Sequence, residues 1–169
     1  MHLTVELTYP ADVDAVAAML ADESSVRWRT ARSTTGGTLE AADVTGSLDS
    51  GFTVAVRRTM PVDTITGHVR HLVGDQVEVR QVEAYEPPSG GRMVGTVAIE
   101  IVGAPVRITG TVRVEPLPDG GTRHVYDGDV HATVPLFANA VAEAAAAAAR
   151  RTLEADADAA RAWLAEHAG

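Results

Sequence analysis

Three side chains that can transfer a proton or bind a metal ion alternate along one segment of the chain: Asp127, Asp129 and His131. Two carboxylates and an imidazole at this spacing could ligate a metal ion or share a proton. Successive residues of a strand point to opposite faces of a sheet, and these three have the parity opposite to Tyr126. We therefore expect them on the outer, solvated face, where Arg107 and Arg113 could pair with them.

A second pair of titratable side chains, His68 and His71, would share one side of a helix if residues 68–73 are helical. Two histidines could begin a metal site, but no third ligand is apparent nearby. The chain has no cysteine, so it can form neither a disulfide nor a thiolate site. It also lacks a phosphate-binding glycine motif, a nucleophile elbow and a metalloprotease helix. We therefore predict no catalytic residue, no metal site and no cofactor.

Polar side chains also occur at positions that the alternation assigns to the inner face of the sheet. Gln81, Glu83 and Tyr85 share one face of a strand, and Arg58 has the parity of the apolar residues that precede it. Buried polar groups need hydrogen-bond partners. Arg58, Glu83 and Tyr126 could satisfy one another at the mouth of a cavity, or they could orient the polar head of a ligand. They could also lie at a wet rim of the sheet.

The strands that must position these groups are predicted by period-two alternation between turn sequences rich in Gly, Pro and Asp. The predicted strands are 2–9, 38–45, 52–61, 77–85, 92–102, 106–115 and 122–134. Short turns between the later strands favour antiparallel neighbours.

Helical spacing predicts two short helices and one long one. Asp12 can cap a helix that ends at Ala21, and a second helix is expected at about 24–32. After Pro135, which suits a first helical turn, nothing interrupts a helix from Leu136 to about His167, and its alanine run has the highest helix propensity.

The order of elements is one strand, two helices, six strands and a long helix. A sheet with one apolar face needs a cover, and the last helix is the element long enough to provide it. We therefore predict an α+β fold, a seven-stranded curved antiparallel sheet around a long C-terminal helix, with two short helices after the first strand. At 169 residues, positions 1–169 are expected to form one domain.

Five segments carry a resemblance to a known family: LTVELTYPAD at 3–12, VEVRQ at 77–81, GAPVRITG at 103–110, DGDV at 127–130 and VPL at 134–136. With them the chain resembles the START-like superfamily, also called SRPBCC or helix-grip, and within it the uncharacterised bacterial family catalogued as domain of unknown function 2505. The superfamily resemblance implies an apolar ligand such as a lipid, a sterol or a polyketide, and enzymes in a minority of cases. The segments that show the family resemblance correspond to turns, strand faces and the entry to a helix. The family resemblance implies no activity for particular residues.

Charge and hydropathy restrict the classes of partner. The net charge of −9 disfavours nucleic-acid binding, because phosphate backbones repel an acidic protein. No apolar run reaches the roughly 18 residues of a membrane span, and the N-terminus lacks the basic region of a signal peptide. We predict no membrane span and a cytoplasmic protein. All 14 basic residues are arginine, which suggests a high-GC bacterial genome.

Our first functional hypothesis is a protein that binds or carries a small apolar, lipid-, sterol- or polyketide-like molecule between the sheet and the last helix. The residues expected to line its cavity are Trp28, Val54, Arg58, Val79, Gln81, Ile99, Ile108, Tyr126, Phe137, Val141 and Ala145. Gln81, Arg58 or Tyr126 would set the orientation of the ligand.

Two alternatives stay open. One is a cyclase- or hydrolase-like enzyme that uses the same cavity with Tyr126 or His124 as an acid–base group. The other is an interaction module with a filled core. The alanine-rich face of the last helix is compatible with all three, because small side chains either leave a cavity or let the helix pack closer to the sheet. The sequence leaves the oligomeric state open as well.

Overall fold

The computed structural model describes residues 1–62 and 74–168. Within them seven strands form one antiparallel sheet in the order β1-β7-β6-β5-β4-β3-β2, so β1 and β2 lie at its two edges. The strands are β1 (His2–Tyr9), β2 (Thr38–Ser47), β3 (Gly51–Pro61), β4 (Gln76–Tyr85), β5 (Met93–Val102), β6 (Val106–Pro116) and β7 (Thr122–Ala132). The predicted sheet is thereby confirmed.

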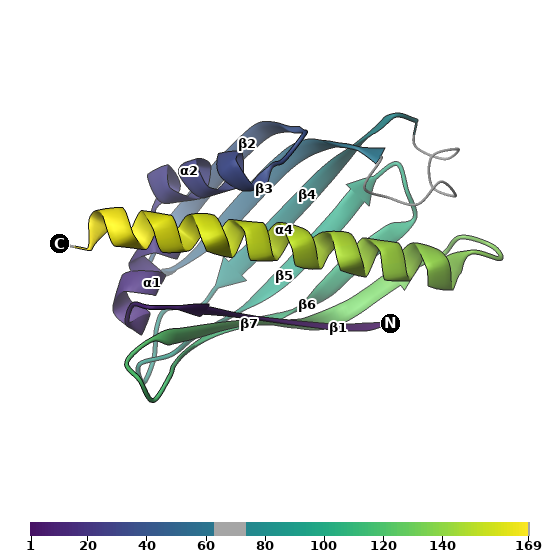
Figure 1. Ribbon diagram of the computed structural model, residues 1–169. Helices are drawn as coiled ribbons and strands as arrows, with labels where there is room; N and C mark the ends of the chain where they lie inside the picture. Colours follow the sequence, from purple (N-terminus) through teal and green to yellow (C-terminus); the bar gives the residue numbers. More distant parts are fainter. Residues whose placement is uncertain (63–73, 169) are drawn as a thin grey trace.

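The three helices of the described residues cover one face of the sheet, which we call the inner face (Figure 1). They are α1 (Val13–Ala21), α2 (Glu23–Ser33) and α4 (Ala138–His167). Asp12 and Asp22 cap the two short helices, because a carboxylate oxygen of each accepts a hydrogen bond from a backbone N–H of the first turn. The long helix α4 crosses the whole sheet, and α1 and α2 lie beside its C-terminal half.

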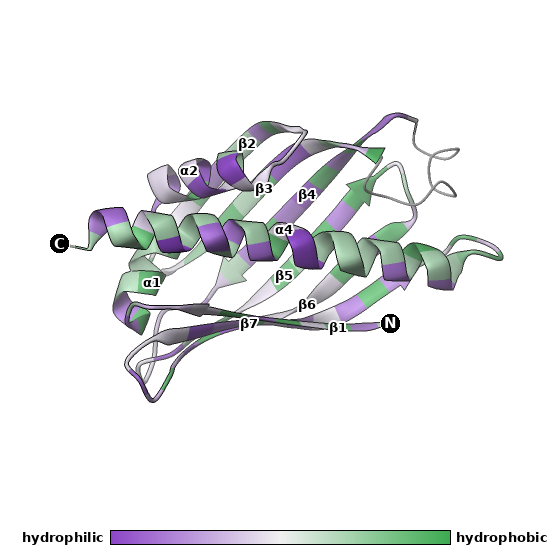
Figure 2. Cartoon of the chain, viewed as in Figure 1, coloured by the Kyte–Doolittle hydropathy of each residue, from purple (hydrophilic) through white to green (hydrophobic). Residues whose placement is uncertain are grey.

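Alternation of buried and exposed residues gives the sheet its two faces. In β1 every second residue, from Leu3 to Tyr9, is buried, and the residues between them are exposed. Figure 2 shows the corresponding alternation of hydrophobic and hydrophilic residues along the strands. The buried stripe of α4, which includes Val141, Leu153 and Leu164, faces this apolar surface and completes the core.

Glycines allow β6 and β7 to approach closely midway along the two strands. Gly110 and Gly128 lie opposite each other in the register of the two strands. A Cβ atom at Gly110 would lie 2.2 Å from the carbonyl oxygen of Asp127, so a larger residue cannot fit there without moving the backbone. This place in the sheet therefore has no side chain on the inner face, where the helix crosses.

The passage from β7 to α4 differs from the sequence prediction. Strand β7 ends at Ala132 and α4 begins at Ala138, whereas the predicted helix begins at Leu136. Leu136 has a φ of +68°, a left-handed conformation that cannot belong to a right-handed helix, and Phe137 is the N-cap residue. The predicted short helix at 68–73, with His68 and His71, lies outside the described residues.

Candidate functional site

A cavity of about 250 Å³ lies between the inner face of the sheet and the middle of α4. Its apolar wall comes from strands β3 to β6 and from the small side chains of the helix: Met60, Val77, Val79, Ile99, Ile101, Val106, Ile108, Ala145, Ala148, Ala149, Leu153 and Ala155. The alanines of α4 thus leave space above the sheet. Thr35 and Arg151, which also line the cavity, are exposed, so the cavity reaches the surface between the end of α2 and α4.

A second, much smaller cavity of about 20 Å³ continues toward α1 and α2. Arg58, Gln81, Thr152 and Leu153 line both cavities and therefore mark the place where the two meet. The apolar space is thus bounded at one end by a wall of buried polar groups.

The first of these groups surrounds Glu83, and we call it the Glu83 network. The carboxylate of Glu83 accepts hydrogen bonds from Gln81 Nε2 (2.6 Å), the Tyr85 hydroxyl (2.5 Å) and the Tyr126 hydroxyl (3.0 Å). Burial and the nearby Glu83 carboxylate raise the pKa of both tyrosines, so the hydroxyls keep their protons and act as donors. The network is therefore a carboxylate held by three neutral donors.

His124 extends the Glu83 network on its other side. Its Nε2 lies 3.1 Å from the Tyr85 hydroxyl, which already donates to Glu83, so Nε2 must carry a proton and donate to Tyr85. Nδ1 is then an unprotonated acceptor, and no described residue forms a hydrogen bond with it. Burial, and to a smaller extent the positive charge of Arg29, lower the pKa of His124 from 6.5 to about 3. The ring is neutral at physiological pH.

The second buried group is an ion pair between α2 and α4. Arg29 Nη1 lies 2.6 Å from Asp156 Oδ2, and Arg29 Nε donates to Ser25 Oγ at 3.1 Å. Burial lowers the pKa of Arg29, but the negative charge of Asp156 and other neighbours outweighs it, so the net direction is upward. This pair fixes α2 to the middle of the long helix.

Removal of single hydroxyls tests the geometry of the Glu83 network. Tyr126→Phe is expected to lower the free energy of unfolding by about 1–2 kcal/mol, because Glu83 loses one buried donor. Tyr85→Phe should cost more, since it removes a donor to Glu83 and the acceptor for His124. Urea unfolding measures the free energy of unfolding of both variants. Tyr9→Phe is the control, because no described residue is hydrogen-bonded to the Tyr9 hydroxyl; equal losses in all three variants would contradict the network.

The structure brings six of the residues proposed from sequence into the wall of the larger cavity: Arg58, Val79, Gln81, Ile99, Ile108 and Ala145. Val54 and Tyr126 line the smaller cavity, together with Arg58 and Gln81. Whether any of them contacts a ligand stays a prediction.

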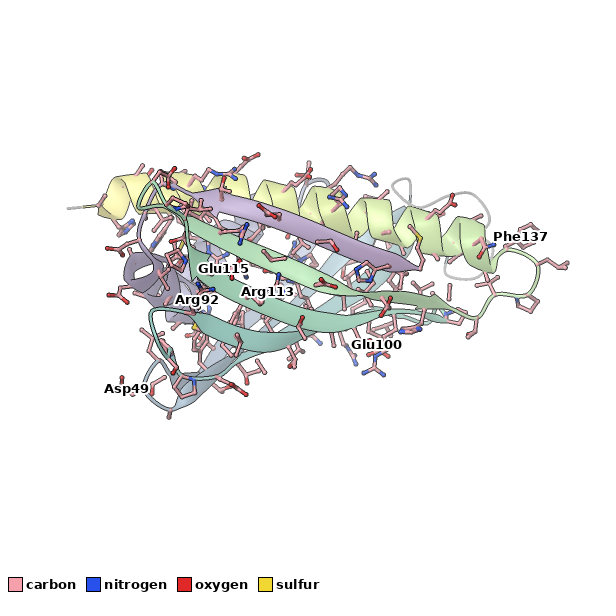
Figure 3. All side chains as sticks on the ribbon, turned by 90° about the horizontal axis from the view of Figure 1, so that it is seen from below. Asp49, Arg92, Glu100, Arg113, Glu115 and Phe137 are labelled. Carbon is pink, nitrogen blue, oxygen red and sulfur yellow. The ribbon has the colours of Figure 1, made fainter. Side chains whose placement is uncertain are left out.

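Three other proposed residues line neither cavity. Trp28 packs on the surface of α2, edge to face against Trp163 at 5.6 Å between ring centroids, so it joins α2 to α4. Val141 is buried in the first turns of α4 against the sheet. Phe137 is 43% exposed at the end of the molecule, where the chain passes from β7 to α4 (Figure 3). Their apolar character predicted a cavity wall, but α4 crosses the sheet and only its middle lies over the cavity.

The alternating triplet Asp127, Asp129 and His131 lies on the outer face, as expected, but its predicted partners are wrong. His2, on the edge strand β1, lies 3.2 Å from Asp127 and 3.3 Å from Asp129. The register explains this contact, because threonines of β6 stand opposite the two aspartates, while His2 of β1 stands opposite Asp129. In the described part of the chain no ion pair joins Arg107 or Arg113 to the aspartates. Figure 3 shows this outer face free of helices.

One of the three interpretations of the inward polar groups was that Arg58, Glu83 and Tyr126 satisfy one another, and the structure shows part of that arrangement. Tyr126 donates to Glu83, but Arg58 forms no ion pair with Glu83. The pair of Arg29 and Asp156 was missed altogether. A signal for Arg29 does exist, since Ser25, Arg29 and Ser33 recur every four residues on one side of α2, but no feature of α4 marks Asp156.

The described residues contain neither a group of metal ligands nor a helix that could span a membrane. In residues 1–62 and 74–168 no three side chains of His, Asp or Glu are arranged to hold a metal ion. Among the described helices, none combines the length and the hydropathy that crossing a membrane requires.

Solved structures with the same architecture include the Zhui aromatase/cyclase from Streptomyces sp. R1128, with a TM-score of 0.62, 16% identity, and coverage of 100% of this chain and 96% of that one. A START superfamily protein from Mycobacterium smegmatis matches with a TM-score of 0.53 and 14% identity over 98% of this chain and 97% of that one. Norcoclaurine synthase from Thalictrum flavum matches with a TM-score of 0.58 and 16% identity over 99% of this chain and 87% of that one. A comparison with curated proteins gives no match.

These likenesses and the arrangement of the sheet around the long helix define the fold as START-like, or helix-grip. The chain belongs to the family described as Protein of unknown function (DUF2505), whose model matches residues 4–164.

Proposed function

We propose that the protein binds a small, largely apolar molecule in the larger cavity. The observation that carries this proposal is an apolar space of about 250 Å³ under α4. It exceeds the roughly 150 Å³ of a dry protein cavity that can hold a benzene-sized molecule. Burial of roughly 200 Å² of apolar ligand surface would contribute about 5 kcal/mol before the costs of association are subtracted.

The arrangement of titratable groups favours binding over catalysis. An enzyme of the cyclase or hydrolase kind needs an acid–base group within reach of its substrate. Tyr126 lines the smaller cavity but not the larger one, and His124 is among the lining residues of neither. The hydroxyl of Tyr126 and Nε2 of His124 are engaged within the Glu83 network.

The ligands of a structural relative support the proposed size. Norcoclaurine synthase from Thalictrum flavum was solved in complex with dopamine and hydroxybenzaldehyde, two small aromatic molecules. At 16% identity that likeness concerns the fold, so it supports a small molecule in this space without indicating its identity.

Occupation of the cavity by a side chain tests the site directly. Ala149 lines the cavity, whereas Ala147 is exposed on the opposite side of the same helix. Ala149→Leu is expected to weaken ligand binding by about tenfold or more while it raises the free energy of unfolding by about 0.5–1 kcal/mol, since it fills empty space. Ala147→Leu should leave binding unchanged.

The measurement is a thermal-shift screen of fatty acids, small aromatic compounds and polyketide-like compounds, followed by calorimetric titration of those that stabilise the protein. Stabilisation by bound ligand rises with ligand concentration, which separates binding from a nonspecific effect. If no compound stabilises the wild type, or if both leucine variants bind as the wild type does, the proposal is wrong.

A further inference from the structure

A buried arginine without a carboxylate partner faces the larger cavity. Arg58 is 3% exposed and lines both cavities. Its guanidinium has five N–H donors, yet the structure gives it one long hydrogen bond, from Nη1 to Ser33 Oγ at 3.5 Å. No Asp or Glu of the described residues lies within ion-pair distance of it.

Arg29 shows what a satisfied buried arginine looks like in the same protein. It is as buried as Arg58, but it pairs with Asp156 at 2.6 Å and bonds Ser25 through Nε. A buried charge is costly unless it is paired and hydrogen-bonded. Arg58 therefore has an unmet requirement for a negative partner that Arg29 does not have.

The nearby carboxylates do not supply that partner. Burial lowers the pKa of Arg58, Asp156 and Glu83 oppose the effect, and Arg29 adds to it, so the net direction stays downward. Asp156 is held by Arg29, and Glu83 by three neutral donors. The guanidinium remains charged, because arginine does not lose its proton in proteins.

The charge of the cavity wall also favours a negatively charged partner for Arg58. Among the described residues that line the larger cavity, the charged side chains are Arg58 and Arg151, and none of these residues carries a carboxylate. This is notable in a chain with a net charge of −9. The hydroxyl-bearing side chains Ser33 and Thr152 lie in the same wall and could donate to an oxygen beside Arg58.

We infer that the ligand is an amphipathic monocarboxylate, whose carboxylate pairs with Arg58 and whose apolar body lies against the valines, isoleucines and alanines of the cavity. This inference rests on the proposed function, because it specifies the charge of the ligand for that same site. The planar guanidinium matches a carboxylate with two parallel hydrogen bonds. One unpaired positive charge offsets one negative charge, which favours a monocarboxylate.

The test compares three molecules of equal length and different head group: octanoate, 1-octanol and octylamine, titrated calorimetrically at about pH 7.5. Octanoate is expected to bind about tenfold or more tightly than 1-octanol, since a charged hydrogen bond is gained, and octylamine should bind least. Arg58→Gln should remove this preference by weakening octanoate about tenfold or more while it changes 1-octanol little.

Arg57→Gln is the matched control, because Arg57 is the preceding residue of β3 and lies on the exposed outer face. It removes the same charge and should leave octanoate binding unchanged. Arg58→Lys keeps the charge but loses the planar pair of donors, so its octanoate affinity should fall between those of the wild type and Arg58→Gln. Removal of an unpaired buried charge is not expected to unfold the protein.

The outcomes separate the two proposals. Binding of 1-octanol as tight as that of octanoate, or an Arg58→Gln variant that still prefers octanoate, would overturn the monocarboxylate inference and leave the proposed function standing. Failure of all three molecules to bind would count against both.

Discussion

Replacement of Arg29 by methionine is expected to lower the free energy of unfolding by about 3–5 kcal/mol, because it leaves the Asp156 carboxylate without its cation. Arg29 is 4% exposed, and the side chain of Asp156 is 19% exposed, so water can screen neither charge well. The lost pair also contributes to the contact between α2 and α4, beside the packing of Trp28 against Trp163. Urea unfolding followed by circular dichroism measures the change.

Two further variants separate the buried charge from loss of packing. In Arg29→Met/Asp156→Leu both charges are gone, and much of the lost stability should return, since a buried ion pair and an apolar pair of similar volume are often equivalent. Arg27→Met removes an arginine of the same helix whose side chain is 58% exposed and pairs with Glu23 and Asp43. It should cost less than about 1 kcal/mol. A double variant no more stable than Arg29→Met would show that the unpaired charge is not the cause.

The fold follows from the sequence to a large extent because its determinants are local. Strand alternation, turn sequences and an uninterrupted alanine-rich segment are each visible within about ten residues. The inner and outer faces of β7 follow from parity alone, so Tyr126 and Asp129 could be assigned to opposite faces. The start of α4 could not be predicted from the sequence, because the left-handed conformation of Leu136 depends on how the chain turns from β7 to the helix.

The site follows from the sequence less well because its determinants are distant in the chain. Arg29 and Asp156 are 127 residues apart. The recurrence of Ser25, Arg29 and Ser33 every four residues marks one side of α2, but no feature of α4 marks Asp156 as the partner of Arg29. Phe137 and Val141 belong to the apolar stripe of α4, but the stripe does not indicate which part of the helix lies over the cavity. The alanines could have let the helix pack closer, and the structure shows that they leave space above β3 to β6.

The cavity and the buried polar groups are parts of one arrangement. Arg58 and Gln81 belong to the cavity wall, Gln81 donates to Glu83, and the Glu83 network leads through Tyr85 to His124. A change of protonation in this wall would therefore alter the surface that a ligand meets. His124, at the end of this network, takes up a proton only in acid, because burial and the charge of Arg29 lower its pKa to about 3.

Acid is expected to destabilise the protein through His124. Its pKa is about 3 in the folded state and close to the ordinary value of 6.5 in the unfolded chain. Between these values the unfolded state binds one proton more than the folded state, so stability decreases as the pH falls from about 6.5 toward 3 and is fully present above 6.5. Two pH units below 6.5 the loss is about 2–3 kcal/mol from this residue alone.

His124→Gln isolates this contribution, because glutamine does not titrate and its amide N–H can take the place of Nε2–H toward Tyr85. The free energy of unfolding of both proteins is measured in urea at about pH 7, 5.5 and 4.5. The carboxylates titrate in both proteins, so their effects cancel in the comparison, and the variant should lose about 2–3 kcal/mol less than the wild type across this range. Parallel losses would mean that His124 can accept a proton in the folded protein. That result would contradict a neutral ring whose Nδ1 is buried and has no hydrogen-bond partner in the described part of the chain.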